Sequence, residues 1–384
     1  MSKLKNTKYK DMYLKEKIIY FLIDVVNKRD KSFKEKCIYF ILLFLSKIYG
    51  WIVKIRLKFF NWGLLKHKTL GCLVISVGNI TAGGTGKTPI VEVFARALKE
   101  EGRKVAVLTR GYRRKKAKDV KNDILVIKGN DSRSVYETGD EALLLSRNLK
   151  DIPVVIGKDR IISGEYAIKE LGCDTLILDD GFQYLALNKR VNIVCIDANN
   201  PFGNGNLIPA GFLREPLDGL KRANMFFITK INNDTKNLDN IYEVIRKYNE
   251  EAPIIKTAYV PKGIMNISNG KLHPLDFAKN KKVVAVSAIA DPVGFEKLLK
   301  ENDINVVDHF VFPDHHFFTM QELKDVEKHT KNIKANMILF TEKDFVKLPD
   351  GFSFKIPAGY LKVGVKIIEG AENFTDCISK LCFT

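Results

Sequence analysis

Cysteine pairs are absent from this sequence. Its 384 residues include six cysteines, and no two of them form a C-x-x-C motif. This spacing argues against a cysteine-ligated zinc site and against a disulfide framework, so scattered buried thiols in a reducing compartment are expected. No repeat of solenoid period is visible either, which argues against a stacked-repeat architecture. The cysteines are Cys37, Cys72, Cys173, Cys195, Cys377 and Cys382.

Acidic residues are in deficit. The chain has 45 Asp and Glu residues against 63 Lys and Arg residues, which gives a net charge of +18. Residues 1–70 hold 17 of the basic residues and 5 of the acidic ones, so two thirds of the excess lies in less than a fifth of the chain. A basic balance fits a nucleic acid, an anionic membrane or an anionic small substrate. No recognised DNA- or RNA-binding motif accompanies the charge, so no nucleic acid partner is expected.

A long uninterrupted apolar run is also missing. Cys37–Val53 falls short of the roughly 20 apolar residues that a membrane span requires, and Lys47 interrupts it. It lies too far into the chain for a signal peptide, and no small-residue cleavage site follows it. Trp51, Trp62 and the neighbouring lysines suit a bilayer interface, so an interfacial or shallowly inserted helix is expected. A full span and a basic helix packed on its own domain are the alternatives. Lys3–Lys36 predicts a further surface helix.

The glycine-rich stretch "GNITAGGTGKTP" (Gly78–Pro89) follows a short apolar run that predicts a buried parallel strand. An amphipathic helix and a second strand come after it, so the loop lies within a β-α-β unit. Its end fits the phosphate-loop pattern G-x-x-x-x-G-K-[ST], but Thr81 occupies the position of the first glycine. Three glycines remain, Lys87 can reach the β- and γ-phosphates, and the Thr88 hydroxyl can bind Mg²⁺. The strand–loop–helix setting favours a phosphate site over a turn that imitates one.

Apolar runs alternate with helical patterns further along the chain, which predicts a mostly parallel sheet covered on both faces. Near Asn269-Gly270 the pattern changes to alternation with a hairpin signal, and two more strands around a helical stretch follow. We therefore expect an α/β fold: a P-loop NTPase-like sheet core, a second, smaller α/β domain and an N-terminal membrane-associated helix. The expected parts are residues 1–66 (the basic, apolar membrane-associated segment), 67–253 (the core with the phosphate loop), 254–276 (a two-stranded connector) and 277–384 (the smaller domain).

Two acids end the apolar strand in "LILDDGFQ". Asp179 and Asp180 stand where a carboxylate would face the same crevice as the phosphate loop, since both lie at the carboxyl edge of the sheet. A nucleotide site needs such a carboxylate for its metal. An acid before glycine can also simply cap a helix, but the neighbouring loop favours the metal role.

Further polar residues stand at strand and helix ends. Asp140 and Glu141 in "TGDEALLL" could complement a helix dipole or supply a general base to a substrate hydroxyl, and the residues alone leave both open. In "FPDHHFF", His315 and His316 beside a single Asp are too few for a metal site. Basic residues at strand ends suggest a site for an anionic substrate: Arg110, Lys158, Arg160 and Arg214.

Taken together, these motifs resemble the tetraacyldisaccharide 4′-kinase family, the lipid A 4′-kinases of Gram-negative bacteria. "SVGNITAGGTGKTP", "LTRGYRR", "GDEALLL", "DDGFQ", "PAGFLREP", "FPDHHFF" and "TEKD" occur in the order of that family, from about Leu73 to Leu348. Thr81 in the loop is itself part of the family's pattern. In the smaller domain, "SAIADP" (Ser287–Pro292) departs from the "GIGxP" expected there, which puts a nucleotide or domain contact in question.

The resemblance implies an ATP- and Mg²⁺-dependent kinase. Its acceptor would be the 4′-hydroxyl of tetraacyldisaccharide 1-phosphate, a lipid-linked disaccharide, and its product lipid IV-A. A monomer on a membrane surface, at the cytoplasmic face of the bacterial inner membrane, is expected. The alternatives are a soluble P-loop ATPase or small-molecule kinase, and a membrane-tethered nucleotide-binding protein.

The resemblance also implies residue roles. Asp140 resembles the family's catalytic base, with His315 as its partner and His316 as a second candidate imidazole; Lys87 would neutralise charge on the transferred phosphoryl group. The metal-proximal set is Thr88, Asp179, Gln183 and Glu215, and Asp180 could substitute for Asp179. The expected nucleotide-binding residues are Thr81, Ala82, Gly83, Gly84, Thr85, Gly86, Lys87 and Thr88. The expected substrate-binding residues are Arg110, Arg160, Glu141 and Asp180.

Overall fold

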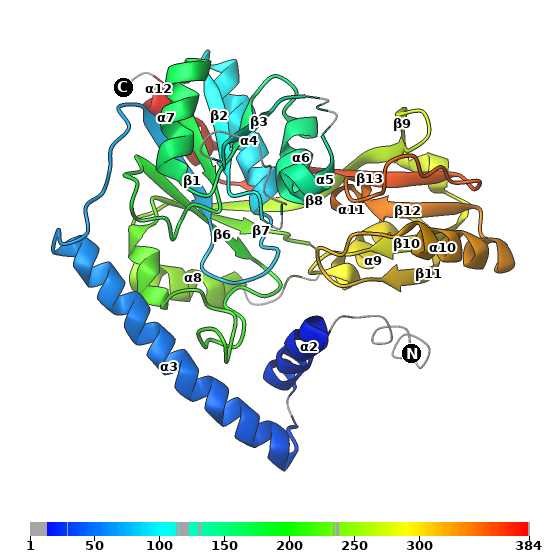
Figure 1. Ribbon diagram of the computed structural model, residues 1–384, viewed down its shortest axis with the longest axis horizontal. Coiled ribbons are helices and arrows are strands. Elements are labelled where there is room, and N and C mark those ends of the chain that lie inside the picture. The colour runs from blue at the N-terminus through cyan, green and yellow to red at the C-terminus, as the bar shows by residue number, and fades with distance from the viewer. Residues whose placement is uncertain are drawn as a thin grey trace.

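A single sheet of thirteen strands runs through the computed structural model, which describes residues 14–28, 30–112, 114, 123–129, 131, 133–232, 235 and 238–382. The expected stretch before residue 14, Arg113 of "LTRGYRR" and residues 383–384 lie outside the described residues. The strand order is β11-β10-β12-β13-β8-β7-β6-β1-β5-β2-β4-β3, with β9 beside β8. Figure 1 shows this sheet divided between a larger and a smaller lobe. The expected α/β fold with a mostly parallel sheet is confirmed.

The larger lobe is built on seven strands. Six of them are short, apolar and parallel, as the sequence indicated, while β3 is an unexpected antiparallel edge strand on β4. Strands buried on both faces read as continuous apolar runs, which is why the sequence predicted them. The strands are β1 (Leu73–Gly78), β2 (Val105–Thr109), β3 (Leu125–Ile127), β4 (Val154–Ile156), β5 (Thr175–Asp179), β6 (Val191–Asp197) and β7 (Met225–Thr229).

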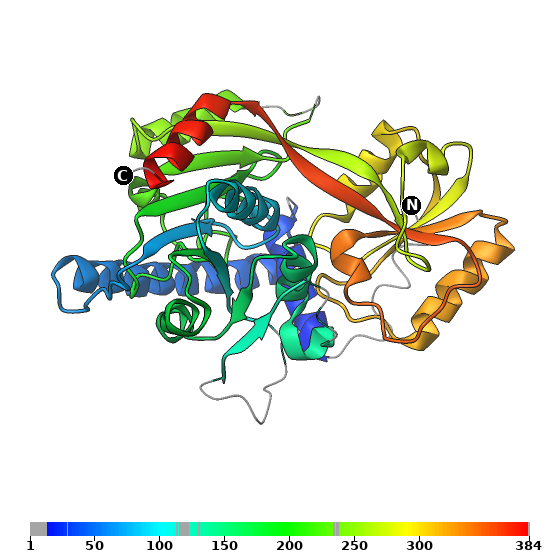
Figure 2. The same cartoon turned by 90° about the horizontal axis from the view of Figure 1, so that it is seen from above.

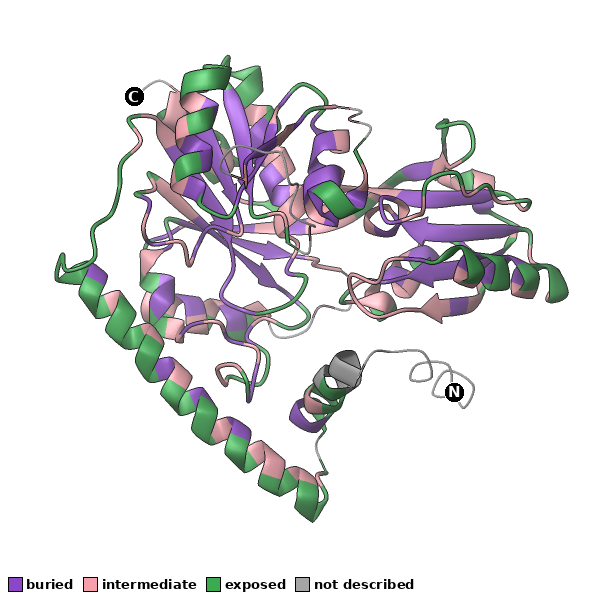
Figure 3. Cartoon of the chain, in the orientation of Figure 1, coloured by how far each residue is buried: buried purple, intermediate pink, exposed green. Residues whose placement is uncertain are grey.

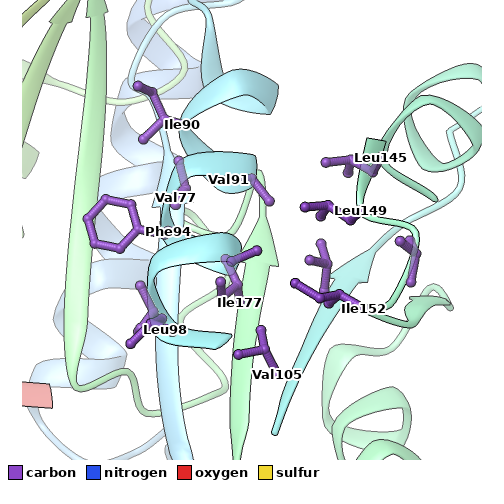
Figure 4. Close-up of a cluster of buried hydrophobic side chains, with 14 of the residues drawn as sticks. Val77, Ile90, Val91, Phe94, Leu98, Val105, Leu145, Leu149, Ile152 and Ile177 are labelled. Atoms are coloured by element: carbon purple, nitrogen blue, oxygen red, sulfur yellow. The ribbon is translucent and has the colours of Figure 1, made fainter. Parts of the chain in front are cut away.

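Helices cover both faces of this part of the sheet. On one face α4 buries Ile90, Phe94 and Leu98 against the strands, beside α6 (Figure 4). α12 packs against the same cluster. The Phe94 ring meets Phe227 and Phe374 edge-on. The other face is covered by α7, α8 and the 3₁₀ turn η2. The helices are α4 (Lys87–Glu100), α5 (Val135–Thr138), α6 (Asp140–Asn148), α7 (Arg160–Leu171), η2 (Leu217–Arg222), α8 (Leu238–Tyr248) and α12 (Ala371–Cys382).

Two long strands continue from one lobe into the other. β8 (Ile254–Asn266) lies parallel to β7 in the larger lobe and antiparallel to β13 (Ala358–Glu369) along nearly its whole length. Figure 2 shows these two strands as the ribbons that join the lobes. The hairpin signal at Asn269-Gly270 lies where β8 turns back into the short strand β9 (Leu272–His273), with Gly270 at φ 66°.

The smaller lobe extends the same sheet with three parallel strands. β10 lies between β11 and β12, and β12 pairs with the first half of β13. α9 and η3 pack on one face of these strands and α10 on the other. The elements are η3 (Leu275–Ala278), β10 (Lys282–Ser287), α9 (Pro292–Glu301), β11 (Asn305–Val311), α10 (Met320–Asn332), β12 (Met337–Thr341) and α11 (Glu342–Phe345).

The N-terminal helices lie along the outside of the larger lobe. α2 spans Leu14–Asn27, and α3 (Phe33–Asn61) starts with a capping box in which Ser32 accepts from the Glu35 N–H. α3 touches the core along one narrow stripe, where the Ser46 hydroxyl donates to the Leu207 carbonyl and the Tyr49 hydroxyl to the Arg214 carbonyl. Most of its apolar residues face outward (Figure 3). By length and composition α3 is the one helix among the described residues that could cross a membrane.

Candidate active site

The phosphate loop between β1 and α4 is held by its neighbours. The Asn79 side-chain amide donates to the Thr85 hydroxyl at 2.8 Å, and the Ala82 N–H donates to the Phe212 carbonyl at 2.7 Å. Gly86 has φ 76°, and a Cβ there would lie 2.8 Å from the Tyr259 hydroxyl. Glycine at this position is therefore required by both backbone and space. Thr81, which occupies the position of the usual first glycine, is only 4% exposed, so its side chain is packed inside the protein.

The loop ends at the amino terminus of α4, whose first two residues are Lys87 and Thr88. No side chain caps this helix end and no acid lies in its first turn. Unpaired N–H groups and the positive end of the helix dipole favour a bound anion. The Lys87 ammonium lies 3.5 Å from Asp180 Oδ1, at the edge of the same site. The arrangement fits a phosphate group.

Asp179 and Asp180 end β5 and have different surroundings. Burial would raise the pKa of Asp180, but Lys87 and Arg214, whose Nη1 lies 2.8 and 2.7 Å from the two carboxylate oxygens, hold it below its usual range. Asp179 is 2% exposed, and burial raises its pKa to about 7, with the negative charges of Glu141 and Asp180 acting in the same direction. A carboxyl whose ionisation is opposed by its burial and by nearby anions is suited to a bound cation.

Gln183 and Glu215 lie together beside the end of β1. The Gln183 side-chain amide donates to Glu215 Oε1 at 2.7 Å and to the Asn79 carbonyl, while Arg222 donates to Glu215 Oε2 at 2.6 Å. Both carboxylate oxygens of Glu215 thus have donors. In the part of the chain that the structure describes, no three His, Cys, Asp or Glu residues are grouped so that they could hold a metal. A magnesium ion that takes one or two carboxylates and completes its shell with phosphates and water fits Thr88 and Asp179 better than Glu215.

Asp140 and His315 meet across the two lobes. Asp140 opens α6 after Gly139, which has φ 85°, and it is only 3% exposed. Its Oδ2 lies 2.7 Å from His315 Nδ1, and its Oδ1 accepts from the Glu141 N–H at 3.0 Å. His315 lies in the turn after β11, with φ 61°, and the ring of Tyr112 meets its imidazole edge-on at 5.7 Å. A carboxylate paired with an imidazole can remove a proton from a hydroxyl.

His316 points elsewhere. Its Nε2 lies 3.0 Å from both carboxylate oxygens of Glu322 at the start of α10, and its ring stacks on Phe312. Of the two neighbouring imidazoles, the structure therefore brings His315 to Asp140 and His316 to a helix of the smaller lobe.

Lys343 is a member of the site that the sequence had not indicated. Its ammonium lies 3.4 Å from His315 Nε2, 3.6 Å from Glu141 Oε1 and 3.8 Å from Asp314 Oδ1. Burial would raise the pKa of Asp140, but the hydrogen bond from His315 and the charge of Lys343 hold it well below its usual range. Lys343 lies in the motif "TEKD" at the end of β12, where Thr341 caps the following helix α11.

Arginines line the other side of the crevice. Arg110 is exposed at the end of β2, whereas Arg160 is buried at the start of α7, with Nη2 3.5 Å from the Asp179 carbonyl. Burial lowers the pKa of Arg160, and the positive charge of Arg110 adds to this. Arg160 Nε is buried without a partner among the described residues. These arginines form the basic side of a site for an anion.

The smaller lobe also reaches the phosphate loop. A Cβ on Gly84 would lie 3.5 Å from the Ala290 methyl, so the segment "SAIADP" contacts the loop despite its departure from "GIGxP". Lys230 at the end of β7 pairs with Asp197 at 2.6 Å and lies 3.9 Å from Asp291 of this segment.

A cavity of about 100 Å³ lies between α3 and the site, next to Glu215. Three arginines and a tyrosine are among its lining residues, so it joins the amphipathic helix to the basic crevice. A larger recess of about 540 Å³ lies at the opposite, amino end of β1 and β5, away from the loop. The smaller cavity is lined by Tyr49, Val53, Arg56, Leu57, Gln183, Leu185, Arg214, Glu215 and Arg222.

Comparisons with known proteins identify the family. The family model described as tetraacyldisaccharide-1-P 4′-kinase matches residues 38–382. A tetraacyldisaccharide 4′-kinase of Elusimicrobium minutum is 37% identical over 357 residues, which cover 92% of this chain and 94% of the relative. One of Syntrophus aciditrophicus is 36% identical over 84% of this chain and 87% of its own length. A crystal structure of LpxK from Aquifex aeolicus in complex with ATP has a TM-score of 0.72 at 30% identity and covers 90% of this chain and all of that one.

Proposed function

Because the chain belongs to the tetraacyldisaccharide-1-P 4′-kinase family and acts as an ATP-dependent tetraacyldisaccharide 4′-kinase in lipid A biosynthesis, we propose the following division of labour among its residues. The observation that carries it is the contact between Asp140 and His315, which lie 2.7 Å apart and come from different lobes. A hydroxyl acceptor needs a proton acceptor, and this pair is suited to that task.

The nucleotide is bound by the loop from Thr81 to Thr88. Its backbone N–H groups and the amino end of α4 receive the phosphates of ATP, and Lys87 neutralises charge on the γ-phosphoryl group. Thr88 and Asp179 hold Mg²⁺, which when bound lowers the negative charge of the phosphates. Gln183 and Glu215 stabilise the surroundings of this site: Gln183 donates to the Asn79 carbonyl, and Arg222 donates to the Glu215 carboxylate. Asp180 holds Lys87 and Arg214 in place.

The acceptor is the 4′-hydroxyl of the lipid-linked disaccharide 1-phosphate. Its oxygen attacks the γ-phosphorus, its proton passes to the Asp140–His315 pair, and the bond between the γ-phosphorus and the bridging oxygen breaks to release ADP. Arg110 and Arg160 face the anionic substrate, and Glu141 borders it next to Asp140. The pair exists only when both lobes are together, so the two lobes act as a closing unit joined by β8 and β13.

The membrane contact is made by α3, at the cytoplasmic face of the inner membrane, and the protein acts as a monomer. The support is chemical: Phe40 and Trp51 are 74% and 73% exposed on a helix that also carries Lys47, Lys54 and Lys58. Apolar side chains enter the headgroup region while lysines meet anionic lipids. The cavity between α3 and the site is lined by Arg56 of α3 and by Arg214 and Arg222 of the larger lobe, so α3 adds a basic residue to this side of the site.

The proposed function is tested by measuring transfer of the γ-phosphoryl group to the lipid directly. Purified protein in detergent micelles receives Mg²⁺, γ-labelled ATP and tetraacyldisaccharide 1-phosphate, and the lipid product is examined for label. Label at the 4′ position, lost when Mg²⁺ is chelated, is the expected result. Label at another position, or hydrolysis of ATP without lipid labelling, would overturn the proposed acceptor chemistry.

A further inference from the structure

Lys343 stands on a rigid base in the smaller lobe. It belongs to α11, where the Thr341 hydroxyl caps the helix by accepting from the Asp344 N–H at 3.1 Å. The Asp344 carboxylate in turn accepts from the Ala288 N–H at 3.0 Å and pairs with the buried Lys347 at 2.6 Å. The Ala288 carbonyl accepts from the backbone of His315. Lys343 and His315 are therefore fixed to the same segment of backbone.

From this base the Lys343 side chain reaches the larger lobe. Its ammonium lies 3.6 Å from Glu141 and 3.9 Å from Asp140, both on α6, and 3.8 Å from Asp314 of its own lobe. The next residue back, Glu342, pairs with Lys362, which contacts Asn148 at the end of α6. The α11 turn thus contacts the start of α6 directly and is linked to its end through Lys362.

The hydrogen-bond partners of His315 then determine the protonation state of its imidazole. An ammonium can only donate, so His315 Nε2, 3.4 Å from Lys343, must accept. An ionised carboxylate can only accept, so His315 Nδ1, 2.7 Å from Asp140, must carry the proton. Asp314 Oδ2 lies 3.7 Å from the same Nε2, beyond hydrogen-bond distance. The neutral Nδ1–H tautomer is therefore the form that satisfies the two hydrogen-bonding neighbours, Asp140 and Lys343. In that form the pair is able to take up a proton.

The charges around Lys343 also favour this arrangement. Three carboxylates, from Asp140, Glu141 and Asp314, lie within 4 Å of Lys343. Burial lowers the pKa of Lys343, but Glu141, Asp140, Asp314 and Asp344 together raise it above its usual value, so the ammonium stays charged. Lys347 adds a second positive charge to the field at Asp140, and Tyr112 meets His315 with its ring.

We propose that Lys343 is a positioning residue of the phosphoryl transfer, which holds the Asp140–His315 pair in its proton-accepting form and fastens the two lobes around it. This inference rests on the proposed function, in which that pair receives the proton of the sugar hydroxyl. Lys343 itself need not touch either substrate. Loss of its charge makes protonation of the pair easier, because a cation that opposed the incoming proton is gone.

The experiment compares pH–rate profiles for Lys343→Met, Lys343→Arg and the unchanged full-length protein, with labelled ATP and tetraacyldisaccharide 1-phosphate in micelles. For Lys343→Met the acid limb of kcat is expected to move up by about one pH unit. Lys343→Arg keeps the charge and is expected to keep the limb in place. The matched control is Lys328→Met, which removes an exposed lysine on α10 of the same lobe. A lower rate at every pH with an unmoved limb would show a merely structural role and overturn the proposal.

Two further measurements keep the outcomes separate. Asp140→Asn in the same assay tests the pair itself. If this variant transfers the phosphoryl group at the normal rate, the proposed function is wrong. If Asp140→Asn loses activity while Lys343→Met keeps the pH–rate profile of the unchanged protein, only the role of Lys343 is rejected. If Lys343→Met does not fold, nitrogen NMR of the ¹⁵N-histidine-labelled unchanged protein decides, with His315 assigned through His315→Gln. A neutral Nδ1–H imidazole at pH 8 supports the proposal, and an Nε2–H tautomer overturns it.

Discussion

The imidazole of His315 lies 2.7 Å from the carboxylate of Asp140, although 175 residues separate them in the chain. Neither lobe alone contains this contact, because Asp140 opens α6 in the larger lobe and His315 follows β11 in the smaller one. Aromatic packing next to it joins the neighbouring helix α5 to the turn that carries His315: Tyr136 stacks on Phe317 with ring centroids 4.9 Å apart. The site is therefore complete only when the lobes are together.

The two neighbouring histidines are expected to differ sharply on mutation. His315→Gln should lower kcat by roughly 10²-fold or more, because the pair loses the group that shares the transferred proton. His316→Gln should change kcat little, since His316 bonds to Glu322 instead. Steady-state kinetics of both variants check this. Equal losses in the two variants would contradict the assignment of His315 to the pair.

The conformation of the phosphate loop is expected to depend on Gly86. Gly86→Ala places a Cβ 2.8 Å from the Tyr259 hydroxyl at a residue with φ 76°, so the loop must distort and the KM for ATP should rise at least tenfold. Gly102→Ala is the control, because Gly102 also has a positive φ but open space around it. That variant should lose about 1 kcal/mol of stability and keep its KM for ATP. Unchanged ATP kinetics in Gly86→Ala would refute the loop geometry.

Membrane binding is expected to depend on the outer face of α3. Replacing Phe40, Phe44 and Trp51 by serine removes apolar area that would enter the bilayer, each side chain contributing about 1–2 kcal/mol. Sedimentation with anionic vesicles should fall by at least tenfold, and binding of the unchanged protein should weaken at high salt. Val293→Ser, at a 75% exposed position on α9, is the control. Equal sedimentation of the triple variant would show that another surface meets the membrane.

Stability is expected to fall with rising pH because of Glu92 on α4. Burial raises the pKa of Glu92 from 4.5 to about 7, despite a hydrogen bond from Asn148. The folded protein thus holds this proton more tightly than the unfolded chain does. The resulting stabilisation is complete below pH 4.5 and is lost as the pH rises through about 7, at up to roughly 1.4 kcal/mol per pH unit.

Urea unfolding between pH 5 and pH 8 measures this slope. Glu92→Gln should flatten it, because the amide does not titrate, whereas Glu100→Gln at the exposed end of α4 should leave it unchanged. An identical slope in Glu92→Gln would mean that other groups cause the dependence.

Most of the larger lobe could be predicted from the sequence, because its strands are buried on both faces. For example, β5 has a continuous apolar centre, Leu176–Leu178, and β7 is apolar from Met225 to Ile228, while the loop before Lys87 has its own pattern. β11 was missed because this edge strand carries Asp308 and His309, whose partners lie on α10 and α9. β13 was missed because its main partner, β8, lies about a hundred residues earlier, and no local pattern reports such pairing.

The candidate site, too, has parts that could be predicted from the sequence and parts that could not. The motif around Lys87 and the acids that end β5 could be found locally, since a loop and a strand end each have a characteristic sequence. The role of Lys343 could not be predicted, because "TEKD" has a complete local role in capping α11 through Thr341 and nothing in it shows what Lys343 contacts. Only the arrangement of the lobes brings Lys343 to Glu141. Similarly, nothing local indicated that Arg222 and Gln183 would occupy both carboxylate oxygens of Glu215.

The most direct test of the account is a single-turnover transfer with Asp140→Asn. The variant keeps the size of the side chain and removes its charge, so ATP should still bind with nearly unchanged affinity while transfer of the γ-phosphoryl group to the 4′-hydroxyl slows by roughly 10²- to 10⁴-fold. Transfer at the rate of the unchanged protein would contradict the central claim that the Asp140–His315 pair receives the proton.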